Sequence, residues 1–355
     1  MNQVDPRIFR AIDANLNRLN EALRVMEDVL RFVVSDPFLT ERCKAIRHRV
    51  TAWSKKMAPS ITTLMRNADG DVGLTNEIKS EYIRHDVWDI VFANMKRAEQ
   101  AMRTLEEFAK MADPQLAAEM EQLRYEAYQF ELPLVALHRP ANRLRESVIY
   151  VLTDTCNDHS EFTAKIEALV SAKVDIIQLR NKSLPDAELF RFAETLSGLT
   201  RSAGVLSIIN DRVDVAVAVN ASGVHLGQED LPIQAARQMT GPNFLIGVST
   251  HNIAQAREAV MRGADYLGIG PTFPSRTKDF QHFAGLEYIR EVVDEISLPG
   301  FAIGGINSEN VMDVVEAGLR RVAISAAIPT DVTQIFPFVE TLRSKLLKER
   351  PAASE

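Results

Sequence analysis

Hydrophobic residues recur at two different spacings along the chain. Up to about residue 130 they follow the three-and-four spacing of amphipathic helices. After Val148, short β-branched runs that end in Gly, Asn or Asp alternate with stretches of helical pattern. The segment between the two regions, LPLVALHRPANRLRE, contains two prolines and indicates a link. We therefore expect a helical domain over residues 1–141 and an α/β domain over residues 142–355.

The helical region contains an internal repeat. The pattern that starts at Ala14 (ANLNR, then ALR, then E) recurs from Ala93 as ANMKR, AMR and E, at a constant offset of 79 residues. Further along, IRH at Ile46 corresponds to LRY at Leu123, at an offset of 77 residues. A helical hairpin used twice predicts a pseudo-symmetric helical bundle.

Polar residues recur within the two copies, with Asn, Arg, Arg and Glu at positions i, i+3, i+9 and i+12. They are typical of a salt-bridged helix face, or of a polar site where the copies meet. Between the copies lies RNADGDVG, which suits a turn or a loop that binds phosphate and metal. The candidate residues of this region are Asn15, Arg18, Arg24, Glu27, Arg47, Arg66, Asp69, Asp71, Asn94, Arg97, Arg103 and Glu106.

The α/β region contains eight predicted strands, most of them separated by stretches of helical length. Eight β-then-α units in about 200 residues predict a (β/α)₈ barrel, also called a TIM barrel. A doubly wound sheet is the alternative, although it more often has five or six strands. The predicted strands are Val148–Leu152, Ile176–Leu179, Leu206–Ile209, Gly223–Leu226, Leu245–Val248, Tyr266–Ile269, Gly300–Ile303 and Val322–Ile324.

Polar residues follow the carboxyl ends of nearly all these strands, and in a barrel these ends converge on one mouth. A single residue such as Asp211 also suits a helix cap, but a whole set of strand ends does not. The cations Arg180, Lys182 and Lys278, with the carboxylates Asp211 and Asp230, predict a diphosphate site that shares a Mg²⁺ ion. A second, monophosphate site is expected at Gly304-Gly305 and Ile324-Ser325, with Ser275 and Thr277 as further donors.

Over residues 147–345 the sequence resembles the thiamine-phosphate synthase family. The resemblance rests on YVLTD at Tyr150, QLRNK at Gln178, IIND at Ile208, GVHLGQED at Gly223, GPTFPSRTK at Gly270 and AIGGI at Ala302. It implies a barrel that joins hydroxymethylpyrimidine diphosphate to thiazole phosphate and releases diphosphate. The implied reaction is dissociative: the diphosphate departs first, and the thiazole nitrogen then attacks a pyrimidine methyl cation.

The resemblance also implies roles for individual residues. Asp211 and Asp230 are the implied Mg²⁺ ligands, and Asn181 stands where the family commonly has an acid. The implied catalytic residues are Arg180, Lys182, Ser249 and Lys278. The pyrimidine diphosphate is implied to contact Gln178, Leu179, Arg180, Asn181, Lys182, Asn210, Ser249 and Lys278. The thiazole phosphate is implied to contact Ser275, Arg276, Thr277, Gly305, Ile324 and Ser325.

The alternative for the barrel is a thiazole tautomerase, or a regulator that binds thiazole phosphate without catalysis. Tautomerase relatives lack the diphosphate and metal side chains that this sequence has. The helical region resembles a second type of hydroxymethylpyrimidine-phosphate kinase, which implies ATP as a substrate. It has no GxxxxGK[ST] motif, so it does not bind ATP through a P-loop. The alternative is a helical dimerisation or scaffolding module.

Composition and charge narrow the remaining choices. No run of eighteen apolar residues exists, the first residues lack an apolar signal segment, and two cysteines are too few for a disulfide scaffold. A cytoplasmic protein is expected. Residues 1–150 carry 22 basic and 22 acidic side chains, so the whole net charge of −7 lies in the rest. We expect small-molecule substrates, no nucleic acid and no membrane; a homo-oligomer is compatible with the sequence.

Overall fold

A computed structural model describes residues 6–57, 83–139, 144, 146–156, 158–274 and 283–348. The chain divides into two compact units, and the division falls between Leu132 and Pro133. The expected boundary, between residues 141 and 142, lies downstream of this division. Each unit is described by itself.

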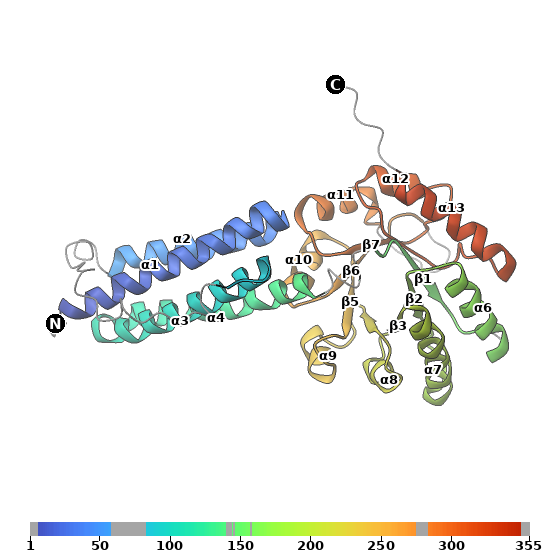
Figure 1. Cartoon of the computed structure of the whole chain (residues 1–355), viewed down its shortest axis with the longest axis horizontal. Helices are drawn as coiled ribbons and strands as arrows, with labels where there is room; N and C mark the ends of the chain where they lie inside the picture. The colour runs from blue at the N-terminus through green and yellow to red at the C-terminus, as the bar shows by residue number, and fades with distance from the viewer. Residues whose placement is uncertain are drawn as a thin grey trace, which may run out of the picture. The chain divides into compact units, whose positions relative to one another are not determined.

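The helical unit consists of two hairpins. The first contains α1 (Pro6–Val29), a π-helical turn η1 (Leu30–Val34) and α2 (Pro37–Met57); the second contains α3 (Val87–Ala112) and α4 (Pro114–His138) (Figure 1). Their buried residues correspond at the offsets found in the sequence: Leu23 with Met102, Met26 with Leu105, Cys43 with Met120, and Trp53 with Phe130. The indole N–H of Trp53 also donates to the carbonyl of Leu116 at 2.8 Å. The expected duplication is therefore present.

The repeat offset changes from 79 to 77 at the end of α1. There the first copy makes the π-turn and places Ser35 in the left-handed region, with φ of 57°, whereas α3 ends directly at Ala112. Both copies then resume at a capping aspartate: Asp36 accepts from the N–H of Leu39, and Asp113 from that of Gln115. The two additional residues of the first copy are thus absorbed in the π-turn.

One expectation about this region was wrong. The proline-containing segment predicted as a link is helical as far as His138, because α4 continues through Pro133. A proline inside a helix removes one backbone hydrogen bond and crowds the preceding turn. Burial of the residues that follow, Leu134, Ala136 and Leu137, offsets this cost.

The second unit is a closed barrel of eight parallel strands in chain order, with β1 paired to both β2 and β8. All eight predicted strands are present, which confirms the (β/α)₈ architecture. The strands are β1 (Ile149–Thr153), β2 (Ile176–Leu179), β3 (Leu206–Asn210), β4 (Gly223–Leu226), β5 (Leu245–Thr250), β6 (Tyr266–Ile269), β7 (Gly300–Ile303) and β8 (Val322–Ile324).

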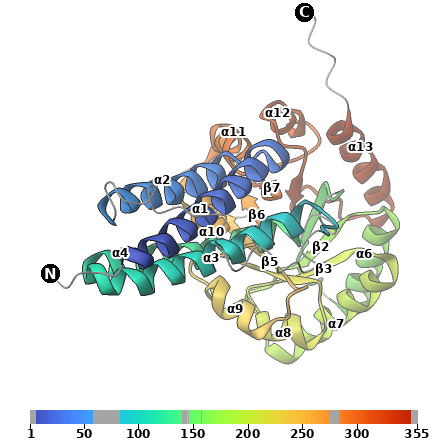
Figure 2. The ribbon, with the colours of Figure 1, turned by 60° about the vertical axis from the view of Figure 1, so that its left-hand side comes forward.

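Helices follow the strands and surround the barrel (Figure 2). They are α6 (His159–Ser171), α7 (Asp186–Ala203), α8 (Val213–Ala218), α9 (Ile233–Met239), α10 (Ile253–Met261), α11 (Gly285–Glu295), α12 (Val311–Glu316) and α13 (Ile335–Leu347). Across the described parts of both units, none of the helices combines the length and the apolarity that a membrane crossing requires.

Aromatic rings fill the barrel interior. Tyr150, Tyr266 and Phe301 are buried together, and the ring of Phe301 lies edge-on to both tyrosines. The ring of Tyr266 covers Gly247, where a β-carbon would lie 2.0 Å from the ring. Alternation along each strand then aims the next inward residues, such as Gln178, Asn210 and Ser249, at the carboxyl mouth.

Candidate functional site

A cavity of about 400 Å³ opens at the carboxyl ends of the strands. Two of the site residues, Asn210 and Ser249, belong to β3 and β5 themselves, because these strands run one and two residues past their predicted ends. Seven of the predicted site residues line the cavity: Gln178, Arg180, Asn210, Ser249, Gly305, Ile324 and Ser325. The structure therefore brings together side chains that lie far apart in the sequence.

Other predicted residues lie elsewhere. Leu179 is fully buried and does not line the cavity, because its side chain alternates with that of Gln178 in β2 and that of Arg180 directly after it. Lys182, Asp211 and Asp230 are likewise absent from the cavity wall and form a group of their own. Ser275, Arg276, Thr277 and Lys278 lie outside the described residues.

The acidic pair is held by specific contacts. Asp211 follows β3 in the left-handed region, with φ of 60°, a conformation that aspartate tolerates better than most residues. Its Oδ2 lies 2.9 Å from Nζ of Lys182. Burial raises the pKa of Asp211, and the adjacent Asp230 raises it further, against the lowering effect of Lys182. Asp230 accepts from the N–H of Gly227 at 2.7 Å.

The two carboxylates lie together, so a cation bound between them stays a prediction; no cluster of three His, Cys, Asp or Glu side chains suited to a metal occurs in the described part of the chain. Two acids placed together repel each other, and this repulsion adds to the effect of burial in raising the pKa of Asp211. A divalent cation would remove this repulsion. Mg²⁺ suits such a pair, because it prefers oxygen ligands and two carboxylates leave several of its coordination positions for substrate oxygens.

Two consecutive glycines follow β7 and face the loop that follows β6. Gly304 and Gly305 have φ values of 102° and 65°, which L-residues with side chains rarely adopt. A β-carbon on Gly304 would lie 2.9 Å from Pro271, and one on Gly305 would lie 2.5 Å from the carbonyl oxygen of Pro274. The glycines therefore let the backbone after β6 pass close to the cavity wall.

Asn181 closes the turn after β2. Its Nδ2 donates to Asp154 Oδ1 at 2.7 Å, and its Oδ1 accepts from the N–H groups of Ser183 and Leu184. An acid at this position would face the carboxylate of Asp154. The departure from the family pattern is thus matched by a hydrogen bond that an ionised acid could not donate.

Sequence reasoning missed the inward-facing residues below the cavity. His225 of β4 lines the cavity and lies between Ser249 and Tyr266, which in turn contacts Tyr150. Burial lowers the pKa of His225 to about 4, although the charge of Asp230 opposes this. The signal was available: His225 is the polar residue at the inward position of VHL, which alternation along a barrel strand identifies.

In the helical unit, the repeated acids form buried ion pairs. Glu27 Oε2 lies 2.8 Å from Nε of Arg47, and Glu106 Oε2 lies 2.8 Å from Nε of Arg124. Each pair joins the two helices of one hairpin, and Arg24 and Arg103 add a contact one turn earlier. Burial opposes ionisation of Glu27, but the hydrogen bond and charge of Arg47, with the charge of Arg24, lower its pKa overall.

The remaining candidates of this unit have other surroundings. The amides of Asn15 and Asn94 both donate to the carbonyl four residues earlier, at 2.8 Å. Arg18 and Arg97 are exposed. Arg66, Asp69 and Asp71 lie outside the described residues, so a polar site where the copies meet stays a prediction.

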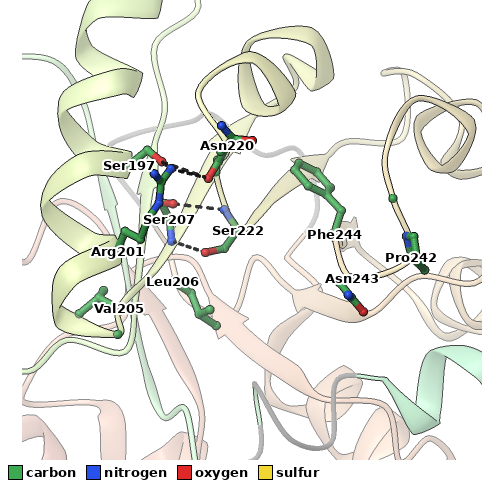
Figure 3. A pocket seen from close by; sticks show the side chains of 13 residues that line it. Ser197, Arg201, Val205, Leu206, Ser207, Asn220, Ser222, Pro242, Asn243 and Phe244 are labelled. Carbon is green, nitrogen blue, oxygen red and sulfur yellow. Dashed lines mark hydrogen bonds between the residues drawn. The ribbon is translucent and has the colours of Figure 1, made fainter.

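A second cavity, of about 440 Å³, lies where β3 and β4 begin, at the opposite end from the carboxyl mouth (Figure 3). The backbone N–H groups of Ser207 and Ser222 each donate to the other residue's hydroxyl at 3.2 Å. Its charged residue, Arg201, donates to Ser197 and to the carbonyls of Val219 and Asn220. Because that guanidinium serves to join α7 to the following loops, we assign no ligand to this cavity.

A closed barrel with a cavity at its carboxyl mouth is the arrangement of (β/α)₈ enzymes, which place their active sites there. Residues 149–328 match the family described as thiamine monophosphate synthase, and residues 10–132 match the ThiD2 family. The chain belongs to the thiamine-phosphate synthase family, whose activity is that of a transferase.

Two relatives match nearly the whole chain. A thiamine-phosphate synthase of Rhodopirellula baltica is 41% identical over 331 residues, which cover 90% of this chain and 88% of that protein. One of Synechocystis is 39% identical over 339 residues, covering 94% and 96%. A solved structure, thiamine phosphate pyrophosphorylase from Pyrococcus furiosus, is 36% identical with a TM-score of 0.51, covering 58% of this chain and 99% of that one.

Proposed function

We propose that the barrel condenses 4-amino-2-methyl-5-(diphosphooxymethyl)pyrimidine with thiazole phosphate, giving thiamine phosphate and diphosphate. The observation that carries this proposal is the meeting of Gln178, Arg180, Asn210 and Ser249 at one cavity, beside the group formed by Lys182, Asp211 and Asp230. The first set suits a polar heterocycle, and the second suits a diphosphate. A tautomerase or a non-catalytic regulator would not require the second set.

Charge stabilisation is the main task of these residues. Arg180 and Lys182 follow β2 and supply positive charge where the diphosphate leaves, which stabilises the charge that develops on its oxygens. Gly304 and Gly305 shape the wall on which the thiazole phosphate would lie. The protein contributes position and electrostatics rather than a covalent intermediate.

Asp211 and Asp230 would hold Mg²⁺, for the reasons given by their proximity and the raised pKa of Asp211. When bound, the metal ion supplies further positive charge to the diphosphate oxygens. Lys182, whose Nζ lies 2.9 Å from Asp211 Oδ2, would add its positive charge beside them.

We further propose that the helical unit phosphorylates hydroxymethylpyrimidine phosphate with ATP, which would produce the diphosphate that the barrel consumes. The match of residues 10–132 to the ThiD2 family supports this activity. The alternative is a dimerisation module.

One assay of the full chain tests both proposals. Thiamine phosphate and inorganic diphosphate are expected from the pyrimidine diphosphate, thiazole phosphate and Mg²⁺. Thiamine phosphate and ADP are expected when the pyrimidine monophosphate and ATP replace the diphosphate. Product in the first mixture alone would reject the kinase, and no product in either would reject the synthase.

A further inference from the structure

Six side chains form one continuous line of hydrogen bonds across the inside of the barrel. In order they are Asn210, Gln178, Tyr150, Tyr266, His225 and Ser249. The donor-acceptor distances along the line are 2.9, 3.2, 3.0, 3.2 and 2.9 Å. Both end residues, Asn210 and Ser249, line the cavity, as do Gln178 and His225.

The line has a single direction, because each hydroxyl carries one proton and a neutral imidazole carries one N–H. Gln178 donates through Nε2 to Asn210, and its Oε1 accepts from the hydroxyl of Tyr150. The Tyr150 oxygen must then accept from Tyr266, and the Tyr266 oxygen must accept from Nδ1–H of His225. Nε2 of His225 is left as an acceptor for the hydroxyl proton of Ser249.

His225 is suited to this role because its surroundings favour one proton. Its two nitrogens face hydroxyl groups, of Tyr266 and Ser249, and neither faces a carboxylate. The imidazole is buried, with only its cavity-facing edge accessible. Gly268 leaves room for the ring, since a β-carbon there would lie 3.2 Å from its Cε1.

We infer that this hydrogen-bonded line is a specificity device: it presents an N–H donor at Asn210 and an acceptor oxygen at Ser249 to the pyrimidine. This inference rests on the proposed synthase function and adds the positioning residues Tyr150, Tyr266 and His225 to it. Nδ2 of Asn210 has no partner among the described residues, and the proton of Ser249 is directed at His225.

The donor and acceptor at the two ends of the line suit an aminopyrimidine. Such a ring offers a nitrogen acceptor next to an amino donor, so it pairs with the donor of Asn210 and the acceptor of Ser249. A 4-oxo pyrimidine offers an N–H donor next to a carbonyl acceptor, which reverses both requirements. Because the six groups are linked, both ends would have to reverse together, and buried groups without partners are costly.

The test compares the 4-amino and 4-oxo pyrimidine diphosphates as substrates of the full chain. Tyr266→Phe and Tyr150→Phe each interrupt the line and keep a ring in the aromatic core. The ratio of kcat/KM for the amino over the oxo substrate is expected to fall at least tenfold in both variants, with the KM for thiazole phosphate unchanged. A ratio within twofold of wild type in both variants would overturn the inference.

Tyr288→Phe is the matched control. Tyr288 is also buried, and its hydroxyl donates to Thr250 at 2.6 Å, outside the line. Its loss is expected to leave the substrate ratio unchanged. An equal fall in this variant would show a general packing effect and would also overturn the inference.

A second measurement does not depend on activity. In ¹⁵N-labelled full chain at pH 7, long-range ¹H–¹⁵N correlations report the tautomer of each of the seven histidines, and His225→Gln identifies the signal. A neutral Nδ1–H tautomer is expected, and an Nε2–H tautomer would contradict the stated direction. If the wild-type enzyme did not condense the two substrates, the synthase proposal would be rejected, but the histidine tautomer could still be measured.

Discussion

At the scale of single residues, the barrel combines groups that gain from being together only when a ligand is present. Asp211 illustrates this best. It is partly buried, in the left-handed region, and next to a second acid, so its ionised form is unfavourable in the free protein. Sites built for binding commonly carry such a cost to stability.

We predict that Asp211→Asn stabilises the metal-free protein and removes synthase activity. The pKa of Asp211 is higher in the folded than in the unfolded state, so ionisation costs stability at neutral pH. The exposed Lys182 adds little to offset this. An increase in Tm of about 2 °C, or roughly 1 kcal/mol, is expected for the barrel transition in calorimetry at pH 7.

The pH dependence and the metal provide the checks. The difference in Tm between variant and wild type should reach its maximum above the pKa that Asp211 has in the folded state. It should vanish as the pH falls below the ordinary value of 3.8. Mg²⁺ should raise the Tm of wild type more than that of the variant. A variant that melts lower than wild type in the absence of metal would contradict this account.

Single residues also show what a sequence reveals and what it hides. Arg180, Asn210 and Ser249 were predictable because polar groups at strand ends converge in a barrel. Tyr150 and Tyr266 were not, because an aromatic residue in a buried strand has the same pattern whether or not its hydroxyl has a partner. Only the strand register shows that these two hydroxyls lie 3.0 Å apart.

At the scale of elements, the repeated helical hairpin is locked by one buried ion pair in each copy. The pair of Glu106 and Arg124 is the more buried: their side chains are 2% and 8% exposed, whereas Glu27 and Arg47 are 5% and 20% exposed. Removal of one partner from a buried pair leaves the other charge without compensation. The two copies should therefore differ in how much this loss destabilises them.

We predict that Glu106→Gln lowers the free energy of unfolding of the helical unit by about 3 kcal/mol and Glu27→Gln by about 1 to 2 kcal/mol. Urea unfolding of the full chain followed by tryptophan fluorescence measures this, since both tryptophans, Trp53 and Trp88, belong to that unit. The control is Glu21→Gln, an exposed glutamate of α1, expected to change stability by less than about 0.5 kcal/mol.

The pH sign follows from the lowered pKa of Glu27. Its contribution is present above the ordinary glutamate value of 4.5 and is lost as the pH falls through the lowered value of the folded state. Equal losses for Glu27→Gln and Glu106→Gln would show that burial of the pair does not decide its contribution.

The sequence patterns predicted the type of each helix or strand better than the residues at which it ends. The 79-residue repeat predicted the two hairpins, and β-branched runs predicted all eight strands. The end of α4 was mispredicted because Pro133 has a high cost in isolation, which the burial of Leu134 and Leu137 offsets. That burial is a tertiary effect, so no local rule for proline contains it.

At the scale of the whole molecule, two units with separate cores share one chain. The barrel has its own closed sheet and core, and the helical unit has its own duplicated core and ion pairs. The residues proposed for the synthase site lie on the barrel strands and the loops that follow them, and none of them lies in the described helices of residues 6–132. Loss of one activity should therefore leave the other.

We predict that Asp211→Asn in the full chain keeps ATP-dependent phosphorylation of the pyrimidine monophosphate within about twofold of wild type. Because the barrel can no longer consume the product, the pyrimidine diphosphate should accumulate in place of thiamine phosphate. Liquid chromatography of the three-substrate mixture measures both compounds. If ATP consumption instead fell together with thiamine phosphate by about tenfold or more, phosphorylation would depend on the barrel site, and the kinase assignment to the helical unit would be wrong.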